Sequence, residues 1–367
     1  MLTAYFSSNS GQKSSIGYLY SLQRYNFQFS IPAFQLIYYF CGVKINQLFF
    51  IEMTSRRLIR IKVLQLLYAY SKKEGVSQAE TERDLLKSIG KSTDLYYQIL
   101  LLLTELRHKA FLKIDAAKNK HFATEDDLHP NTRFIDNPIF SKLSENKKFK
   151  SYLLNHPISW NDNMELIYFL YNTITGHPVY KEYMSREEVN FEDHKRFILD
   201  IFTEIIAQNE IFFQTLEDIN IYWNDDFELV LNVVYKTLKN IKESDTENDN
   251  IFYAIYNEAE DLDFAKMLLR KTILEQDENL KIIDKYILNW EIERISDMDK
   301  LIMSLALSEL KHFPAIPIKV TLDEYIEITK SYSSPKSGPF INGVLDKAVA
   351  QLKETEQIHK TGRGLME

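Results

Sequence analysis

The sequence predicts an all-α fold in which a helical bundle carries an additional helical region. Helix breakers are scarce, because the 367 residues include only 10 Gly and 9 Pro, and no stretch shows the period-two alternation of a strand. Apolar residues instead recur at helical spacing after residue 53. The chain is 45% hydrophobic and 26% charged, the balance of an ordinary globular protein, and it is long enough to bury two compact cores.

The helices can be placed one by one. The first is expected over 55–70, with Ser55 as its N-cap and Gly75 beyond its end, and the second over 93–115, capped by Ser92 or Thr93. Residues 119–162 are polar and contain three prolines, which favours a linker with little regular structure. Further helices are expected over 164–175, 186–216, 225–242, 264–275, 278–290, 297–312, 321–332 and 341–356.

The first 52 residues differ in composition from the rest. Their apolar run over 31–43 is shorter than the roughly 18 to 20 residues that a membrane span needs, and it does not fit a signal peptide. Met53 is followed at once by an amphipathic, arginine-rich pattern that is typical of a natural start. We therefore interpret residues 1–52 as a non-native or disordered extension.

The overall charge limits the kind of partner. A net charge of -8 and a pI near 5.6 argue against a protein that coats nucleic acid indiscriminately, because such proteins carry a basic surplus. Any nucleic-acid site must therefore be a local patch. The single cysteine, Cys41, excludes a disulfide framework within the chain, and a cytoplasmic protein is expected.

No catalytic centre is predicted. The glycines are too scattered to form a phosphate-binding loop, and the eight histidines do not form pairs at metal-ligand spacing. The acidic segment 245–249 lacks the glycine and the glutamate of a calcium loop. We expect a protein that is not an enzyme and needs no cofactor or metal.

Two stretches contain the residue types that bind RNA. The first is a basic turn whose guanidinium groups could clamp phosphates; its members are Arg56, Arg57, Arg60 and Lys62. The second is a loop over 330–343, in which aromatic rings could stack on unpaired bases while amides and amines hold them; its members are Lys330, Tyr332, Lys336, Phe340 and Asn342. The alternatives are a solvated basic turn and a capped interhelical turn with Phe340 in the core.

The C-terminal part resembles the NusB transcription antitermination factors. The residues that carry the resemblance lie at 297–310, 316–320, 323–324, 328–332 and 340–347, and the arginine-rich start resembles the first helix of the same family. The resemblance implies a NusB-like helical bundle with an insertion. The expected ranges are an extension over 1–52, the first part of the core over 53–117, an inserted region over 118–250, the C-terminal core over 251–356 and a flexible tail over 357–367.

The resemblance also implies a function. Members of the family bind the boxA element of ribosomal RNA leader transcripts together with the ribosomal protein NusE, within an RNA polymerase antitermination complex. Carried over by position, both stretches would contact this single-stranded RNA, while Tyr68 and Asp299 would face NusE. One alternative is an interaction scaffold that has lost RNA binding. A helical domain of a ribosomal RNA methyltransferase is less favoured, because residues 53–367 hold neither a cofactor loop nor a cysteine nucleophile.

Overall fold

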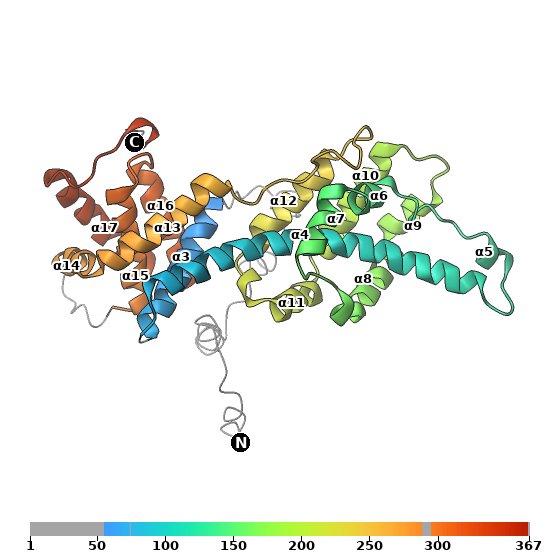
Figure 1. Ribbon diagram of the computed structural model, residues 1–367, viewed down its shortest axis with the longest axis horizontal. Coiled ribbons are helices and arrows are strands. Elements are labelled where there is room, and N and C mark those ends of the chain that lie inside the picture. The colour runs from blue at the N-terminus through green and yellow to red at the C-terminus, as the bar shows by residue number, and fades with distance from the viewer. Residues whose placement is uncertain (1–54, 74, 288–294, 366–367) are drawn as a thin grey trace, which may run out of the picture. The chain divides into compact units, whose positions relative to one another are not determined.

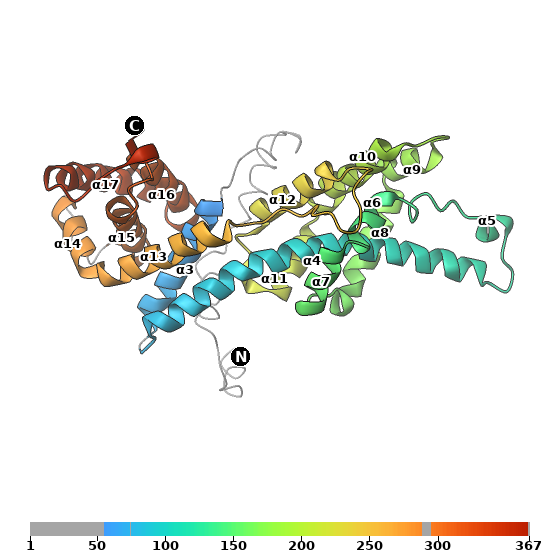
Figure 2. The ribbon, with the colours of Figure 1, turned by 45° about the horizontal axis from the view of Figure 1, so that its top comes forward.

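The computed structural model describes residues 55–73, 75–287 and 295–365. Helices and short helical turns make up the regular structure of these ranges, and no strand occurs in them (Figures 1 and 2). None of the helices there is long and apolar enough to cross a membrane. The predicted all-α class is confirmed, whereas the interpretation of residues 1–52 concerns a part of the chain outside the described residues.

The described residues divide into two compact units. Residues 55–89 and 256–365 form the core unit, and residues 90–255 form the inserted unit. The long helix α4 (Gln78–Lys118) contributes its first turns to the core unit and the rest to the inserted unit. The division falls between residues 89 and 90, inside a helix, rather than after residue 117 as the sequence suggested.

The core unit is built around α3 (Ser55–Lys72). This helix packs against α13 (Glu258–Leu274) and α15 (Asp297–His312), with α16 (Ile318–Tyr332) beside it (Figures 1 and 2). Two further helices, α14 (Gln276–Tyr286) and α17 (Ser337–Glu354), pack on α15. Apolar side chains are buried on most sides of α3. Burial of a large apolar side chain contributes about 1.5 to 3 kcal/mol, so tertiary packing stabilises this helix.

The inserted unit has its own apolar core along α4. The Tyr96 hydroxyl of α4 lies 2.7 Å from the Thr237 hydroxyl, and the Trp160 indole N–H donates to the Gln98 carbonyl at 3.0 Å. The other elements of this unit are α5 (Glu125–Leu128), α6 (Pro138–Ser144), α7 (Lys147–Asn155), η2 (Asn161–Asn163), α8 (Met164–Gly176), α9 (Pro178–Ser185), α10 (Phe191–Ile201), η3 (Phe202–Ile206), α11 (Glu210–Ile219), η4 (Ile221–Trp223) and α12 (Phe227–Asn240).

The prediction of a linker with little regular structure over 119–162 was wrong. Three short helices and a 3₁₀ turn occupy it, and the polar residues that suggested a loop are their N-caps. The Asn137 side chain accepts from the Ile139 N–H, and the Asn146 side chain accepts from the Lys148 and Phe149 N–H groups. Caps of this kind satisfy backbone donors that a short helix leaves open.

Two other helix boundaries also differ from the prediction. α4 begins at Gln78, because Ser77 and Glu80 form reciprocal hydrogen bonds that start the helix. Ser92 is therefore not a cap; it lies inside α4 and its hydroxyl donates to Asp226 at 2.6 Å. The single helix expected over 186–216 is interrupted by the π-helical turn η3 and restarts where Asn209 caps α11.

The two units differ in charge. Residues 90–255 contain 18 Lys and Arg against 27 Asp and Glu, whereas residues 55–89 and 256–367 contain 23 against 24. The negative charge of the chain is therefore concentrated in the inserted unit. A polyanion such as RNA is repelled less by the core unit than by the inserted unit.

Candidate nucleic-acid interface

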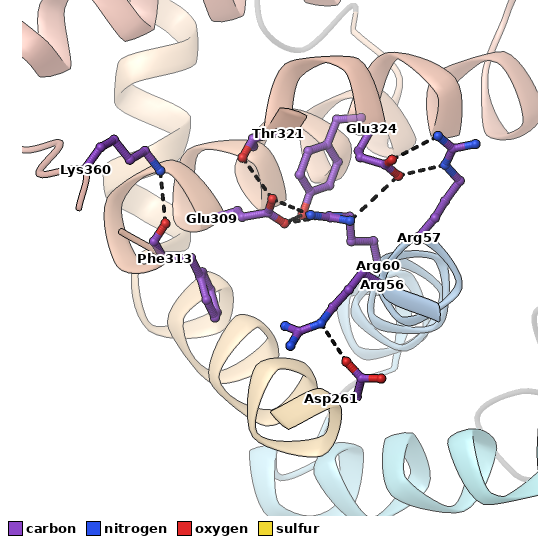
Figure 3. Close-up of polar contacts among 10 residues, drawn as sticks. Arg56, Arg57, Arg60, Asp261, Glu309, Phe313, Thr321, Glu324 and Lys360 are labelled. Carbon is purple, nitrogen blue, oxygen red and sulfur yellow. Dashed lines mark hydrogen bonds and ion pairs between the residues drawn. The ribbon is translucent and has the colours of Figure 1, made fainter. Parts of the chain in front are cut away.

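The arginine turn, which we define as Arg56, Arg57 and Arg60, lies in the first two turns of α3. Its guanidinium groups point to different neighbouring helices (Figure 3). Arg56 lies 2.6 Å from the Asp261 carboxylate of α13 and 4.5 Å from the centre of the Phe264 ring. Arg57 makes a bidentate pair with Glu324 of α16 at 2.7 and 2.9 Å. The turn therefore joins α3 to α13 and α16.

Arg60 is buried at the centre of this arrangement. Its guanidinium donates to both oxygens of Glu309, each at 2.7 Å, and Glu309 also accepts from the hydroxyls of Thr321 and Tyr325. Burial acts to lower the pKa of Arg60, but the Glu309 carboxylate more than offsets this, so the pKa is raised. Burial and the same carboxylate raise the pKa of Tyr325. Arg60 therefore keeps its charge, and its hydrogen bonds to Glu309 help hold α3, α15 and α16 together.

Two residues predicted to bind RNA are therefore withdrawn from solvent. Arg60 is 2% exposed and Lys62 is 1% exposed. The Lys62 ammonium lies 3.3 Å from the Ser88 hydroxyl of α4, so this lysine faces the inside of the core unit. Both predictions need correction, because the helix turns these two side chains inward. Arg56 and Arg57 keep 33% and 23% of their side chains exposed.

The second predicted stretch is shorter than the loop that was expected. α16 continues to Tyr332 and α17 begins at Ser337, so only residues 333–336 connect the two helices. Lys336 stands at the N-cap of α17, while Phe340 and Asn342 lie in the first two turns of that helix. Pro339 is tolerated there because the first turn of a helix does not use its N–H groups. We call Tyr332, Lys336 and Phe340, with residues 333–335, the aromatic turn.

The side chains of this region differ in their exposure to solvent and in whether they have a partner within the protein. Lys336 and Asn342 are exposed, and Tyr332 and Phe340 are partly exposed. The Asn342 amide donates to Asp346 at 3.0 Å, and Lys330 is paired with Glu327. Among the described residues, Lys336 makes no hydrogen bond or ion pair and the Phe340 ring makes no contact with another ring, so Lys336 can meet a ligand without breaking an ion pair.

The two turns are connected through α3 and α16. Arg57 contacts Glu324 in the middle of α16, and the Gln65 amide donates to the Tyr332 hydroxyl at the end of that helix, at 3.2 Å. Both helices advance by eight residues between these contacts, so they run parallel. Eight residues correspond to about 12 Å along the helix axis. The arginine turn and the aromatic turn therefore lie along the same pair of helices in the core unit.

The two residues predicted to face a protein partner lie in different settings. Tyr68 is partly exposed, with the Lys72 ammonium 5.5 Å from its ring. Asp299 is 7% exposed, and its carboxylate accepts hydrogen bonds from the Ser333 and Ser337 hydroxyls. Asp299 therefore holds the aromatic turn in position through its hydrogen bonds with these two serines. The prediction that it faces a partner needs correction, because both of its oxygens are occupied within the core unit.

The chain has clear relatives among known proteins. The transcription antitermination protein NusB of Salinibacter ruber is 39% identical over 138 residues, which cover 36% of this chain and 86% of that protein. The chain belongs to the NusB family. The protein of the same name from Chloroherpeton thalassium is 38% identical over 107 residues and is covered over 51% of its length. Among solved structures, T. maritima NusB is matched at 27% identity, with 40% of this chain and 89% of that chain covered and a TM-score of 0.26.

Membership of the NusB family confirms the predicted resemblance. The sequence model described as the NusB family matches residues 207–350, which include α11 and α12 of the inserted unit, α13 to α16 and most of α17. The arginine turn on α3 lies outside this match. Its assignment to the same site therefore depends on the contacts that join α3 to α13, α15 and α16.

Acid sensitivity is expected at one edge of this NusB core. The hydrogen bond from Lys72 lowers the pKa of Asp297, and burial opposes it. A carboxyl whose pKa is depressed by folding stabilises the fold above its unfolded pKa, and this contribution is lost as pH falls through the folded value. Asp297 is half exposed, so the effect should be at most about 1 kcal/mol.

Urea unfolding at neutral and at acidic pH measures this effect. The Asp297→Asn variant should lose less stability on acidification than the unmodified chain, because it has no carboxylate to protonate. Glu354→Gln, which changes an exposed carboxylate at the end of α17, is the matched control. An equal loss for the Asp297 variant and the unmodified chain would contradict the assignment.

Sequence reasoning missed the residues that hold the arginines. Glu309 stands in an apolar run of α15 and is fully buried. A carboxylate at such a position needs a cation, because an unpaired buried charge is costly. That rule indicates an ion pair within the core, although it does not identify Arg60 as the partner.

Proposed function

We propose that this chain is a transcription antitermination factor that binds boxA-type single-stranded RNA of ribosomal RNA leaders together with NusE. It would act in the cytoplasm as part of an RNA polymerase antitermination complex and would carry out no catalysis. The proposal is supported by the relatives named as transcription antitermination proteins and by the position of the two turns on one unit.

The observation that carries the proposal is the parallel pairing of α3 and α16. The contact of the partly exposed Arg57 with Glu324 and the contact of Gln65 with Tyr332 of the aromatic turn are eight residues apart on both helices, about 12 Å along their axes. Cations that hold phosphates next to rings that stack on bases are the combination by which proteins bind unpaired RNA. The near-neutral core unit suits this better than the acidic inserted unit.

Replacing Phe340 by Ala should weaken RNA binding by about 1 to 3 kcal/mol, because a stacked base loses its aromatic platform. The measurement is a titration of a labelled boxA-type RNA, with and without NusE, at two salt concentrations. Affinity should fall as salt rises, since neutralised phosphates release counterions.

The matched control is Phe111→Ala, which removes a phenylalanine that is 52% exposed in the inserted unit. It should leave RNA affinity unchanged. Equal affinities of a folded Phe340→Ala variant and the unmodified chain would remove the aromatic turn from the site.

A second candidate function is a scaffold that no longer binds RNA. It is favoured by the observation that Arg56, Arg57 and Arg60 each have a carboxylate partner in the core unit, so RNA must compete with Asp261 and Glu324. Binding of NusE without binding of RNA in the same titration would support the scaffold.

A further inference from the structure

The last part of the chain folds back onto the core unit. We define the C-terminal strap as residues 357–365, which end in the 3₁₀ turn η6 (Gly362–Leu365). The Lys360 ammonium donates to the Phe313 carbonyl at 3.1 Å, and the Thr361 N–H donates to the Pro314 carbonyl at 3.0 Å. The strap expected to be a flexible tail is thus attached to the connection between α15 and α16.

Two glycines fix the path of the strap. Gly362 has a φ of +55°, a conformation that side-chain-bearing residues rarely adopt. Gly364 is buried, and a Cβ atom at that position would lie 1.9 Å from the Pro314 carbonyl oxygen. Any side chain at 364 must therefore displace the strap from its contact with the core unit.

The strap reaches the packing that surrounds the arginine turn. Phe313, which accepts from Lys360, packs edge-on against Phe264 with ring centres 4.8 Å apart, and Arg56 lies over that same Phe264 ring. Figure 3 shows Lys360 and Phe313 on the far side of Glu309 from Arg57. Burial lowers the pKa of Lys360, and the negative charge of Glu309 opposes that change. Lys360 therefore interacts electrostatically with the same buried carboxylate that binds Arg60.

The strap also brings cationic and aromatic groups that are not already paired. Arg363 and His359 are exposed, and neither has a partner among the described residues. The three arginines of the arginine turn, in contrast, all contact carboxylates. A phosphate can bind Arg363 without breaking an internal ion pair, and such a charge-assisted contact is among the stronger hydrogen bonds.

We propose that the C-terminal strap forms a third part of the RNA-binding surface, in which Arg363 holds a backbone phosphate of the single-stranded RNA. This inference rests on the function proposed above and extends the site beyond the two turns. The strap is attached by Lys360 and Thr361, and its path requires glycine at 364, so that the backbone at Arg363 is held in place before RNA arrives.

Salt-dependent RNA titrations of the full chain test the proposal. Arg363→Gln should weaken binding of a labelled boxA-type RNA about three- to tenfold and should reduce the slope of log affinity against log salt by about 0.7, the value for one phosphate contact on a single strand. Lys353→Gln, which removes an exposed charge from α17 outside the strap, is the matched control and should change neither quantity.

A second variant tests the attachment itself. Gly364→Val should release the strap, which hydrogen exchange of residues 357–365 would detect, and should weaken RNA binding at least as much as Arg363→Gln. Unchanged affinity and slope in Arg363→Gln, while the unmodified chain binds RNA, would overturn the role of the strap and leave the proposed function standing. No RNA binding by the unmodified chain, with or without NusE, would overturn both.

Discussion

Replacing Glu309 by Gln is expected to lower the free energy of unfolding of the core unit by about 3 to 5 kcal/mol, the cost of leaving a buried charge without its partner. Arg60 would remain 2% exposed without the carboxylate that accepts its bidentate hydrogen bonds, and its other acidic neighbour, Glu324, lies 3.7 Å from its guanidinium. The hydroxyls of Thr321 and Tyr325 would lose a charged acceptor at the same time. This is a large fraction of the stability of a typical domain.

Urea unfolding followed by peptide-resolved hydrogen exchange measures this loss, because the two units need not unfold in one step. Protection should fall in α3, α15 and α16, where the network is made. Replacing both partners, Arg60→Met with Glu309→Leu, should recover most of the stability, since neither charge is then buried. A double variant as unstable as the single one would show that packing, and not charge, causes the loss.

Replacing Trp160 by Ala is expected to destabilise the inserted unit by about 3 to 5 kcal/mol. Trp160 is 1% exposed, and its indole N–H donates to the Gln98 carbonyl of α4, so the substitution leaves a cavity and removes a hydrogen bond. Hydrogen exchange should accelerate across residues 90–255. The RNA affinity of the core unit should be unchanged, because both turns lie outside that range.

The control for this variant is Tyr168→Ala, which removes an aromatic side chain that is 43% exposed in α8 of the same unit. It should change stability by a fraction of the Trp160 effect. Loss of protection in α3 and α15 as well as in the inserted unit would contradict the division of the chain into two compact units.

Helical periodicity predicted both ends of a helix correctly where the capping residue and the apolar repeat indicate the same boundaries. α15 was predicted at its observed limits, because an apolar repeat follows directly on Ser296, whose side chain caps the helix by accepting from the Asp299 N–H. Thr124, Asn137 and Asn146 misled the prediction, since each caps a helix too short to show an apolar period. The same residue types are typical of loops, and the sequence alone did not separate the two uses.

The candidate site was predictable only in part. The sequence grouped Arg56, Arg57 and Arg60 as one basic patch, but whether a cation is exposed depends on which partners the fold brings to it. The decisive partner of Arg60 is Glu309, 249 residues away, and no local pattern connects the two. The strap was missed for the same reason, because its contacts with Phe313 and Pro314 cross 47 residues.

The long separation of Arg60 from Glu309 has a consequence for how the protein is made. At roughly 5 to 20 residues per second, a ribosome delivers Glu309 on the order of 10 to 50 s after Arg60, given the 249 residues between them. During that interval the part of α3 that packs on α15 and α16 lacks its native cover, while the nascent chain completes every residue of the inserted unit.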